Sequence, residues 1–249
     1  HTGTDILFLS DSGVRSFGRT IQEKSMPMRD ISKNVRTDLM HLVPLQTNAI
    51  KSLYSADEAF YLITLPDSNL VYSFDMRSPL EDGSQRATSW SSLLPLSMTT
   101  LEDGTIYFGL AAGIVKYSGY LDGTANYQMR YFSNPMDFGN ASNLKFLKKF
   151  TITVIGGQNT DSTLSWGYDY TTNFTKQVFT LSGTSNAGEY GLSEYNTTAE
   201  YTASAVINTP KVNTSGSGEV VTIGVESELN GSAFSIQKID IHALLGRLI

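Results

Sequence analysis

The chain has 249 residues, of which 40% are hydrophobic and 17% charged, and it carries a formal net charge of −6. The acidic balance argues against a protein whose main task is to grip nucleic acid by its phosphates. The absence of cysteine excludes disulfides and thiolate metal sites. Abundant Tyr, Phe, Gly, Thr and Ser favour strands and turns, so we expect an all-β chain with one or two hydrophobic cores.

The N-terminal part predicts a hairpin followed by a helix. Residues 5–19 contain two β-prone runs around a turn at residues 10–13. In residues 25–43 the spacing of apolar residues becomes helical. Pro27 lies near the expected helix start, and Ile31, Val35 and Leu39 follow at helical spacing. We expect one inserted helix near 25–43, packed on a sheet face or placed at a subunit interface. The first residue is His1, and we expect the chain to be the downstream piece of something longer.

Residues 60–90 carry the clearest pattern in the sequence, which predicts a continuous β-meander. Two alternating runs, 60–65 and 70–74, flank the turn at residues 66–69, and a second turn at 81–84 leads to a third strand over 85–90. A looser repeat covers 96–119. Asp-Gly pairs recur at Asp82, Asp103 and Asp122, which are 21 and 19 residues apart. This recurrence predicts propeller-like blades for residues 1–123.

From residue 124 the predicted strands become longer. They cover 126–132, 146–155, 164–170, 176–181, 198–208, 219–229 and 234–245, with a Gly-, Ser- and Asn-rich linker over 183–194. Long strands with alternation on two faces predict a β-sandwich over 124–249.

The sequence contains no pattern typical of a catalytic or cofactor site. A Ser-His triad is rejected because the chain has no Gly-x-Ser-x-Gly elbow, and His1, His41 and His242 suit structural or surface roles better. Calcium-loop and phosphate-loop spacings are also missing, so we expect no catalytic residue, no metal and no cofactor. A glycosidase-like pair stays open among the acids near the meanders, although most of these lie in turns. They are Asp75, Glu81, Asp82, Glu102, Asp103 and Asp122.

Two surface features are candidates for contacts with partners. Lys145, Lys148 and Lys149 open the predicted strand at Phe146, and they would either face DNA or guard a strand end against edge pairing. Several tyrosines would serve a subunit interface or a sugar-binding platform. These are Tyr117, Tyr120, Tyr127, Tyr131, Tyr168 and Tyr170.

The order of four phrases resembles the tail-nozzle, or tail tubular B type, stabilisation proteins of short-tailed bacteriophages. The phrases are FYLITLPDSNLVYSFDMRSPLEDGSQRATSW, GTIYFGLAAGIVKYSGYLDG, FSNPMDFGNASNLKFLKKFTITV and SIQKIDIHALLGRLI. The matching motifs are Tyr-x-Phe-Asp at Tyr72 to Asp75, Arg-x-x-x-Trp at Arg86 to Trp90, and Gly-x-x-Tyr-Phe-Gly from Gly104. Members of that family are much longer, so we expect this chain to correspond to the part that follows their N-terminal half.

The resemblance implies a virion structural protein of the tail and no catalytic residues. Such proteins form hexameric rings next to the tail adaptor ring and tail fibres, and genomic DNA passes through their central channel without sequence-specific binding. We therefore expect a homohexameric tail subunit that seals or conducts the genome during DNA ejection. Two alternatives stay open: a carbohydrate- or receptor-binding β-module, and a glycan-cleaving propeller enzyme.

Overall fold

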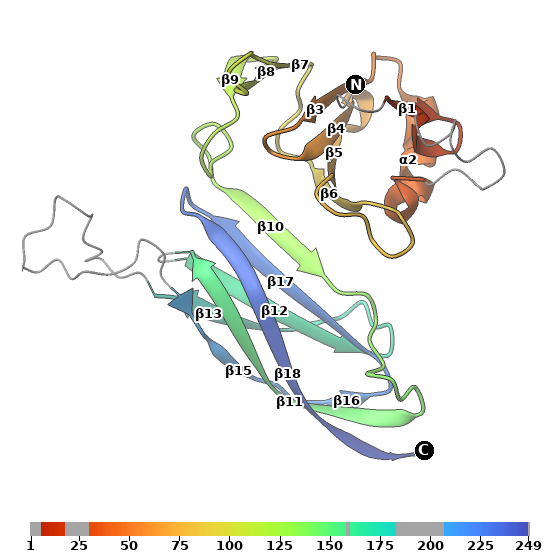
Figure 1. Cartoon of the computed structure of the whole chain (residues 1–249). Helices are drawn as coiled ribbons and strands as arrows, with labels where there is room; N and C mark the ends of the chain where they lie inside the picture. The colour runs from red at the N-terminus through yellow and green to blue at the C-terminus, as the bar shows by residue number, and fades with distance from the viewer. Residues whose placement is uncertain (1–5, 18–29, 158–159, 183–206, 249) are drawn as a thin grey trace, which may run out of the picture. The chain divides into compact units, whose positions relative to one another are not determined.

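Antiparallel sheets make up most of the chain, which confirms the predicted all-β class with one inserted α-helix (Figure 1). The computed structural model describes residues 6–17, 30–157, 160–182 and 207–248. The chain divides into two compact units, residues 1–118 and residues 119–249. The division falls a few residues before the expected boundary at residue 123. Each unit has hydrophobic core clusters of its own.

The first unit holds the predicted N-terminal hairpin and the two meanders. Its strands, within the described residues, are β1 Leu7–Ser10, β2 Gly13–Ser16, β3 Lys51–Ser55, β4 Phe60–Leu65, β5 Leu70–Asp75, β6 Arg86–Trp90, β7 Ser97–Thr100, β8 Ile106–Leu110 and β9 Gly113–Lys116. They form a β1-β2 hairpin, a four-stranded sheet β3-β4-β5-β6 and a three-stranded sheet β7-β8-β9.

The helical segment is shorter than predicted. A 3-10 turn, Lys33–Val35, leads into α2, Arg36–Leu42, and a second 3-10 turn, Val43–Leu45, ends it. The predicted helix near 25–43 is therefore wrong over residues 30–32, while 25–29 lie outside the described residues.

A tertiary contact explains the late helix start. The backbone N–H of Ile31 donates to the carbonyl of Val14, and its own carbonyl accepts from the N–H of Gln85, both at 3.0 Å. These bonds join the hairpin to the meander and commit both backbone groups of Ile31 to segments outside the helix. Ser32 strengthens the junction, because its Oγ accepts from the N–H of Val14 at 2.9 Å and donates to Asp30 Oδ1 at 2.7 Å.

The β3-β6 sheet is covered on both faces, which accounts for the continuous apolar run of β4. All six β4 residues are buried. Tyr61 and Ile63 pack in one cluster with the hairpin and α2, whereas Phe60 and Leu62 pack in another with β8. The predicted alternation is therefore real, but both of its faces belong to the core.

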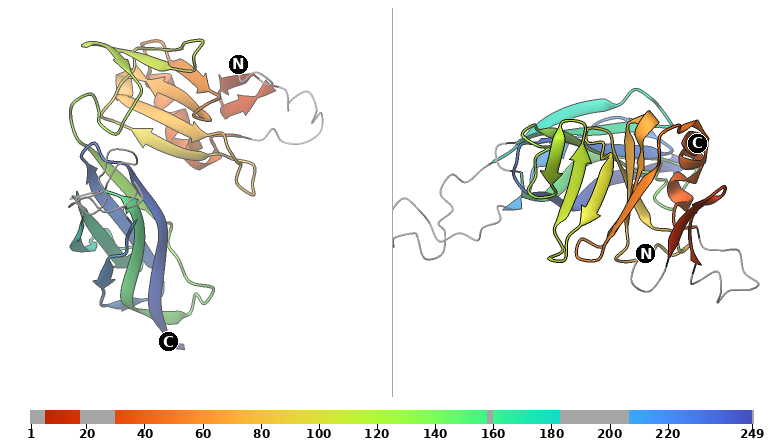
Figure 2. Two further views of the ribbon diagram at one scale, coloured as in Figure 1. Left: turned by 60° about the vertical axis from the view of Figure 1, so that its left-hand side comes forward. Right: turned by 90° about the horizontal axis from the view of Figure 1, so that it is seen from above.

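The second unit is built from two sheets. Its described strands are β10 Tyr127–Phe132, β11 Asn143–Gly156, β12 Thr160–Tyr168, β13 Thr175–Leu181, β14 Ile207–Asn208, β15 Lys211–Asn213, β16 Ser217–Gly218, β17 Val221–Leu229 and β18 Phe234–Leu248. One sheet has the order β10-β17-β12-β13. In the other, β11 pairs with β18 along its whole length and with β14, β15 and β16 on its opposite edge (Figures 1 and 2).

Inward-facing residues of both sheets share one core cluster. Phe150 and Ile152 of β11 lie in the same cluster as Leu164 and Trp166 of β12 and Val225 of β17. Face-to-face packing of this kind is what a β-sandwich requires. The sandwich and the propeller-like blades, as named architectures, stay predictions.

Most predicted strands appear within two or three residues of their expected bounds. One exception is β12, which begins four residues before the strand predicted over 164–170. Of the strand predicted over 198–208, only β14 falls within the described residues, and the predicted linker over 183–194 falls outside them. The expected turn at 215–218 contains β16, which pairs with the start of β11.

Candidate nucleic-acid interface

The three lysines proposed from the sequence lie on β11, where a bulge decides their directions. Leu147 is opposite Ala243 of β18, and the next pair joins Lys149 to His242, so Lys148 is an extra residue. A bulge of this kind places two consecutive residues on the same side of the strand. Leu147 and Phe150 are buried, whereas Lys148 is exposed and Lys149 half-buried. Lys148 and Lys149 therefore both face outward.

Lys145 points the other way, and its assignment as a DNA-facing residue is wrong. Its side chain is completely buried, and its Nζ donates to the backbone carbonyl of Asn140. Lys145 precedes the bulge, so it has the same inward direction as Leu147. An ammonium group in this position holds the loop before β11 in place and cannot reach a phosphate.

Sequence reasoning missed the basic residues that the neighbouring strands bring to the same face. Asn213 of β15 and His242 of β18 lie directly opposite Lys149, on its two sides. In the next outward row Lys211 and Asp240 flank Thr151, and Lys238 lies opposite Thr153. Directly opposite residues of an antiparallel pair share a face. No local signal in the sequence could have revealed this set, because it depends on which strands pair.

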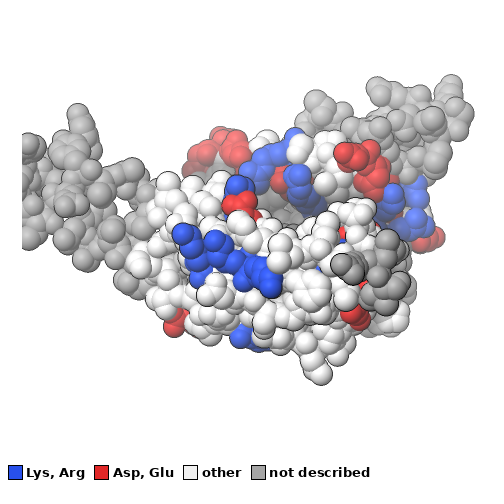
Figure 3. Space-filling view, turned by 90° about the horizontal axis from the view of Figure 1, so that it is seen from below, with Lys and Arg blue, Asp and Glu red and all other residues white. Residues whose placement is uncertain are grey.

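The resulting outer face of the β15-β11-β18 sheet, here called the basic face, carries Lys148, Lys149, Lys211, Lys238 and His242. Asp240 is the one acid in the three strands, and it accepts from Lys238 Nζ at 2.8 Å. Figure 3 shows a row of Lys and Arg side chains on the surface. The face is therefore locally basic in a chain whose net charge is −6.

The acids near the meanders hold turns. Asp103 accepts from the N–H of Thr105 at 2.9 Å, and Asp82 accepts from Lys33 Nζ at 2.8 Å and from the N–H of Ser84 at 3.0 Å. The hydrogen bond from Thr105 lowers the pKa of Asp103, and the bond from Lys33, followed by those from Ser84, lowers the pKa of Asp82 well below its usual range.

Asp75 behaves in the same way at the end of β5. Partial burial acts to raise its pKa, but hydrogen bonds from the backbone N–H and the guanidinium of Arg77 outweigh burial and lower it. A general acid needs a raised pKa. The Asp75, Asp82 and Asp103 carboxylates are thus suited to stabilising turns and poorly suited to donating protons.

The remaining acidic candidates, Glu81, Glu102 and Asp122, lie in connecting segments. The backbone of Asp122 forms an isolated bridge with Ala125.

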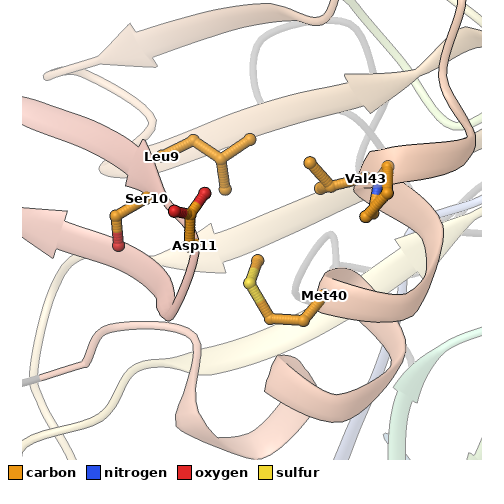
Figure 4. A pocket seen from close by; sticks show the side chains of 6 residues that line it. Leu9, Ser10, Asp11, Met40 and Val43 are labelled. Carbon is orange, nitrogen blue, oxygen red and sulfur yellow. The ribbon is translucent and has the colours of Figure 1, made fainter.

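A shallow hollow in the first unit lies between the β1-β2 turn and α2. Figure 4 shows Leu9, Met40 and Val43 directed toward a shared space, with Ser10 and Asp11 at its edge; Pro44 completes the lining. A single carboxylate and a mainly apolar wall do not make a two-acid site.

The histidines and acids do not gather into a metal site in the described part of the chain. His41 lies on α2 and His242 on the basic face, whereas His1 falls outside the described residues. Among the described residues, no helix has the length and apolar character needed to cross a membrane.

The tyrosines considered as a platform are divided between the two units: Tyr117 lies in the first, where its ring stacks on Trp90 at a centroid distance of 6.4 Å, and the others lie in the second. Tyr127 and Tyr131 lie on β10, Tyr170 is 75% exposed beyond the end of β12, and Tyr168 donates its hydroxyl to the carbonyl of Ser215 at 3.0 Å.

The fold and its surfaces define an all-β protein with a basic sheet face and turn-bound acids. Comparison with family models gave no match, and no curated protein matches the chain.

Proposed function

We propose that the chain is a non-catalytic structural subunit of the tail of a short-tailed bacteriophage, where it assembles into a hexameric ring and helps to seal or conduct the genome. The adjacent adaptor ring and tail fibres would be its neighbours in the virion. The proposal begins from the four phrases that resemble tail-nozzle proteins.

The observation that carries the proposal is how the phrases relate to the fold. The phrase over 60–90 contains β4, β5 and β6 of one antiparallel meander, and the phrase over 104–123 contains β8 and β9 of the next. The phrases over 132–154 and 235–249 contain most of β11 and β18, the two longest strands, which pair with each other. The phrases thus coincide with paired strands in both units, as expected if the resemblance concerns a common scaffold.

The state of the acids agrees with a structural role. A glycan-cleaving enzyme needs one carboxyl group with a raised pKa near a second one. At Asp75, Asp82 and Asp103 the pKa is lowered by turn hydrogen bonds and nearby cations. These groups stay ionised at neutral pH and contribute to the turns of the first unit.

The channel wall of such a ring is expected to be acidic or neutral, because excess lysine would retain passing DNA. Lys148, Lys149 and Lys211 lie together on the outer face of the β15-β11-β18 sheet. We therefore expect the basic face to lie outside the channel.

The mass of the purified chain in solution, measured by size-exclusion chromatography with light scattering, tests the proposal, together with negative-stain imaging. Ring-shaped particles of about six copies support it. A lone monomer at high concentration contradicts ring formation by this chain. Release of reducing sugar from host polysaccharide would support the enzyme instead, and binding on a glycan array would support the carbohydrate-binding module.

A further inference from the structure

The end of the β11-β18 pair exposes large apolar side chains next to the basic face. Phe146 and Leu244 lie directly opposite each other on the outward side and are 36% and 59% exposed. Leu245, on the other side of β18, is 54% exposed, although its partner Lys145 is buried. We call Phe146, Leu244 and Leu245 the apolar tip. The two leucines are thus exposed on opposite sides of β18.

Gly246 lets the ring of Phe146 lie close to the backbone of β18. A Cβ atom at Gly246 would lie 2.8 Å from the ring of Phe146 and 3.3 Å from the Cβ of Leu144. The ring therefore rests against the backbone of β18, where a larger residue would push it away. The aromatic ring and Leu244 thus lie on one side of the strand pair, and Leu245 lies on the other.

Basic side chains follow immediately behind the tip. Leu244 and His242 are two positions apart along β18, which corresponds to about 7 Å. Lys149 lies opposite His242, and Lys148 occupies the neighbouring bulge. Lys211 belongs to the next outward row. An apolar edge with lysines about 7 Å behind it matches the depth of roughly 5–10 Å to which interfacial segments enter a bilayer.

We propose that the apolar tip and the basic face together dock on an anionic lipid surface. The tip would enter the boundary between headgroups and acyl chains, while Lys148, Lys149 and Lys211 would contact the lipid phosphates. Nucleic acid would account for the lysines but would leave the two leucines in water. The charge sign and the adjoining exposed leucines therefore favour lipid. This inference goes beyond the tail-subunit proposal and does not depend on it.

The test is co-sedimentation of the full chain with vesicles of phosphatidylcholine containing about 30% phosphatidylglycerol, compared with vesicles of phosphatidylcholine alone. We expect binding to the anionic vesicles that weakens at high salt. The double variant L244S/L245S should bind at least about tenfold more weakly, because the apolar insertion is lost. The double variant K149Q/K211Q should lose about 25-fold, at about fivefold for each lysine.

Matched substitutions elsewhere keep the test specific. V178S removes a side chain that is 60% exposed on β13, and K51Q/K116Q removes two exposed lysines of the first unit. These controls should bind vesicles like the wild type. Circular dichroism of every variant verifies that the strands are intact.

Several results would overturn the inference. One is absence of binding to anionic vesicles; another is equal binding to neutral ones. The inference would also fail if L244S/L245S kept its strands by circular dichroism and bound anionic vesicles as strongly as the wild type. If L244S/L245S instead abolished self-association, or if K149Q/K211Q reduced only binding to a DNA duplex, a second copy or nucleic acid would be the partner. If the chain is monomeric but still binds vesicles through the tip, the result contradicts ring formation and leaves the lipid-docking proposal standing.

Discussion

Substitution of Lys145 by Glu gives the sharpest test of the site assignment, because three neighbouring lysines that look equivalent in sequence have different environments. Lys145 is fully buried, and its Nζ donates to the carbonyl of Asn140. Gly218 lies directly opposite on β16, and a Cβ atom there would lie 2.8 Å from Asp169 Oδ2. A carboxylate at position 145 would therefore be buried near another carboxylate.

The expected cost follows from these contacts. An uncompensated buried charge costs about 3–5 kcal/mol, so K145E should lower the free energy of unfolding by that amount. K145M keeps the apolar stem and removes the buried ammonium group. The Asn140 carbonyl then loses a donor worth about 1 kcal/mol, which the removal of the charge offsets. K145M should therefore be as stable as the wild type within about 1 kcal/mol, or more stable.

Urea unfolding at neutral pH, followed by circular dichroism, measures these differences. K149E is the matched control, since Lys149 lies on the outward side of the same strand. It should change the free energy of unfolding by no more than about 0.5 kcal/mol. Equal stability of K145E and K149E would refute the inward direction of Lys145 and restore it as a surface residue.

Three further predictions concern the scaffold. Gly156 has φ +81°, and a Cβ there would lie 1.9 Å from a backbone oxygen, so G156A should destabilise by several kcal/mol in urea unfolding; G139A, at φ +78° with open space, should cost only about 1 kcal/mol, and equal losses would contradict the clash. Hydrogen bonds, first from the backbone of Asn48, lower the pKa of Asp67 from 3.8 to about 2, so its contribution to stability is present above pH 3.8 and is lost as the pH falls toward 2. D67N should therefore melt below the wild type at neutral pH and with it near pH 2, and a difference that persists in acid would disprove the linkage. L39A should lose about 2–5 kcal/mol because Leu39 is fully buried on α2, whereas I114A, at a side chain 79% exposed, should stay within about 0.5 kcal/mol by the same assay.

Local patterns were sufficient to predict the strands and most turns. The alternation of residues 60–65 and 70–74, and the Asp-Gly pairs at Asp82 and Asp103, produced β4, β5 and the connections expected from them. Alternation and positive-φ glycines act within a few residues, so a sequence displays them directly. The turn-binding role of Asp103 was predictable for the same reason.

Pairing between distant strands decided the rest. Ile31 continues a helical pattern, yet its backbone bonds go to Val14 and Gln85 outside the helix, because each segment must satisfy its backbone groups in the folded chain. The separation of Lys145 from Lys148 and Lys149 depends on a bulge that exists only because β11 pairs with β18. Lys211 and His242 reach the same face only through that sheet. Composition and alternation thus determined an all-β chain, and tertiary pairing decided which charges are buried and which form a surface.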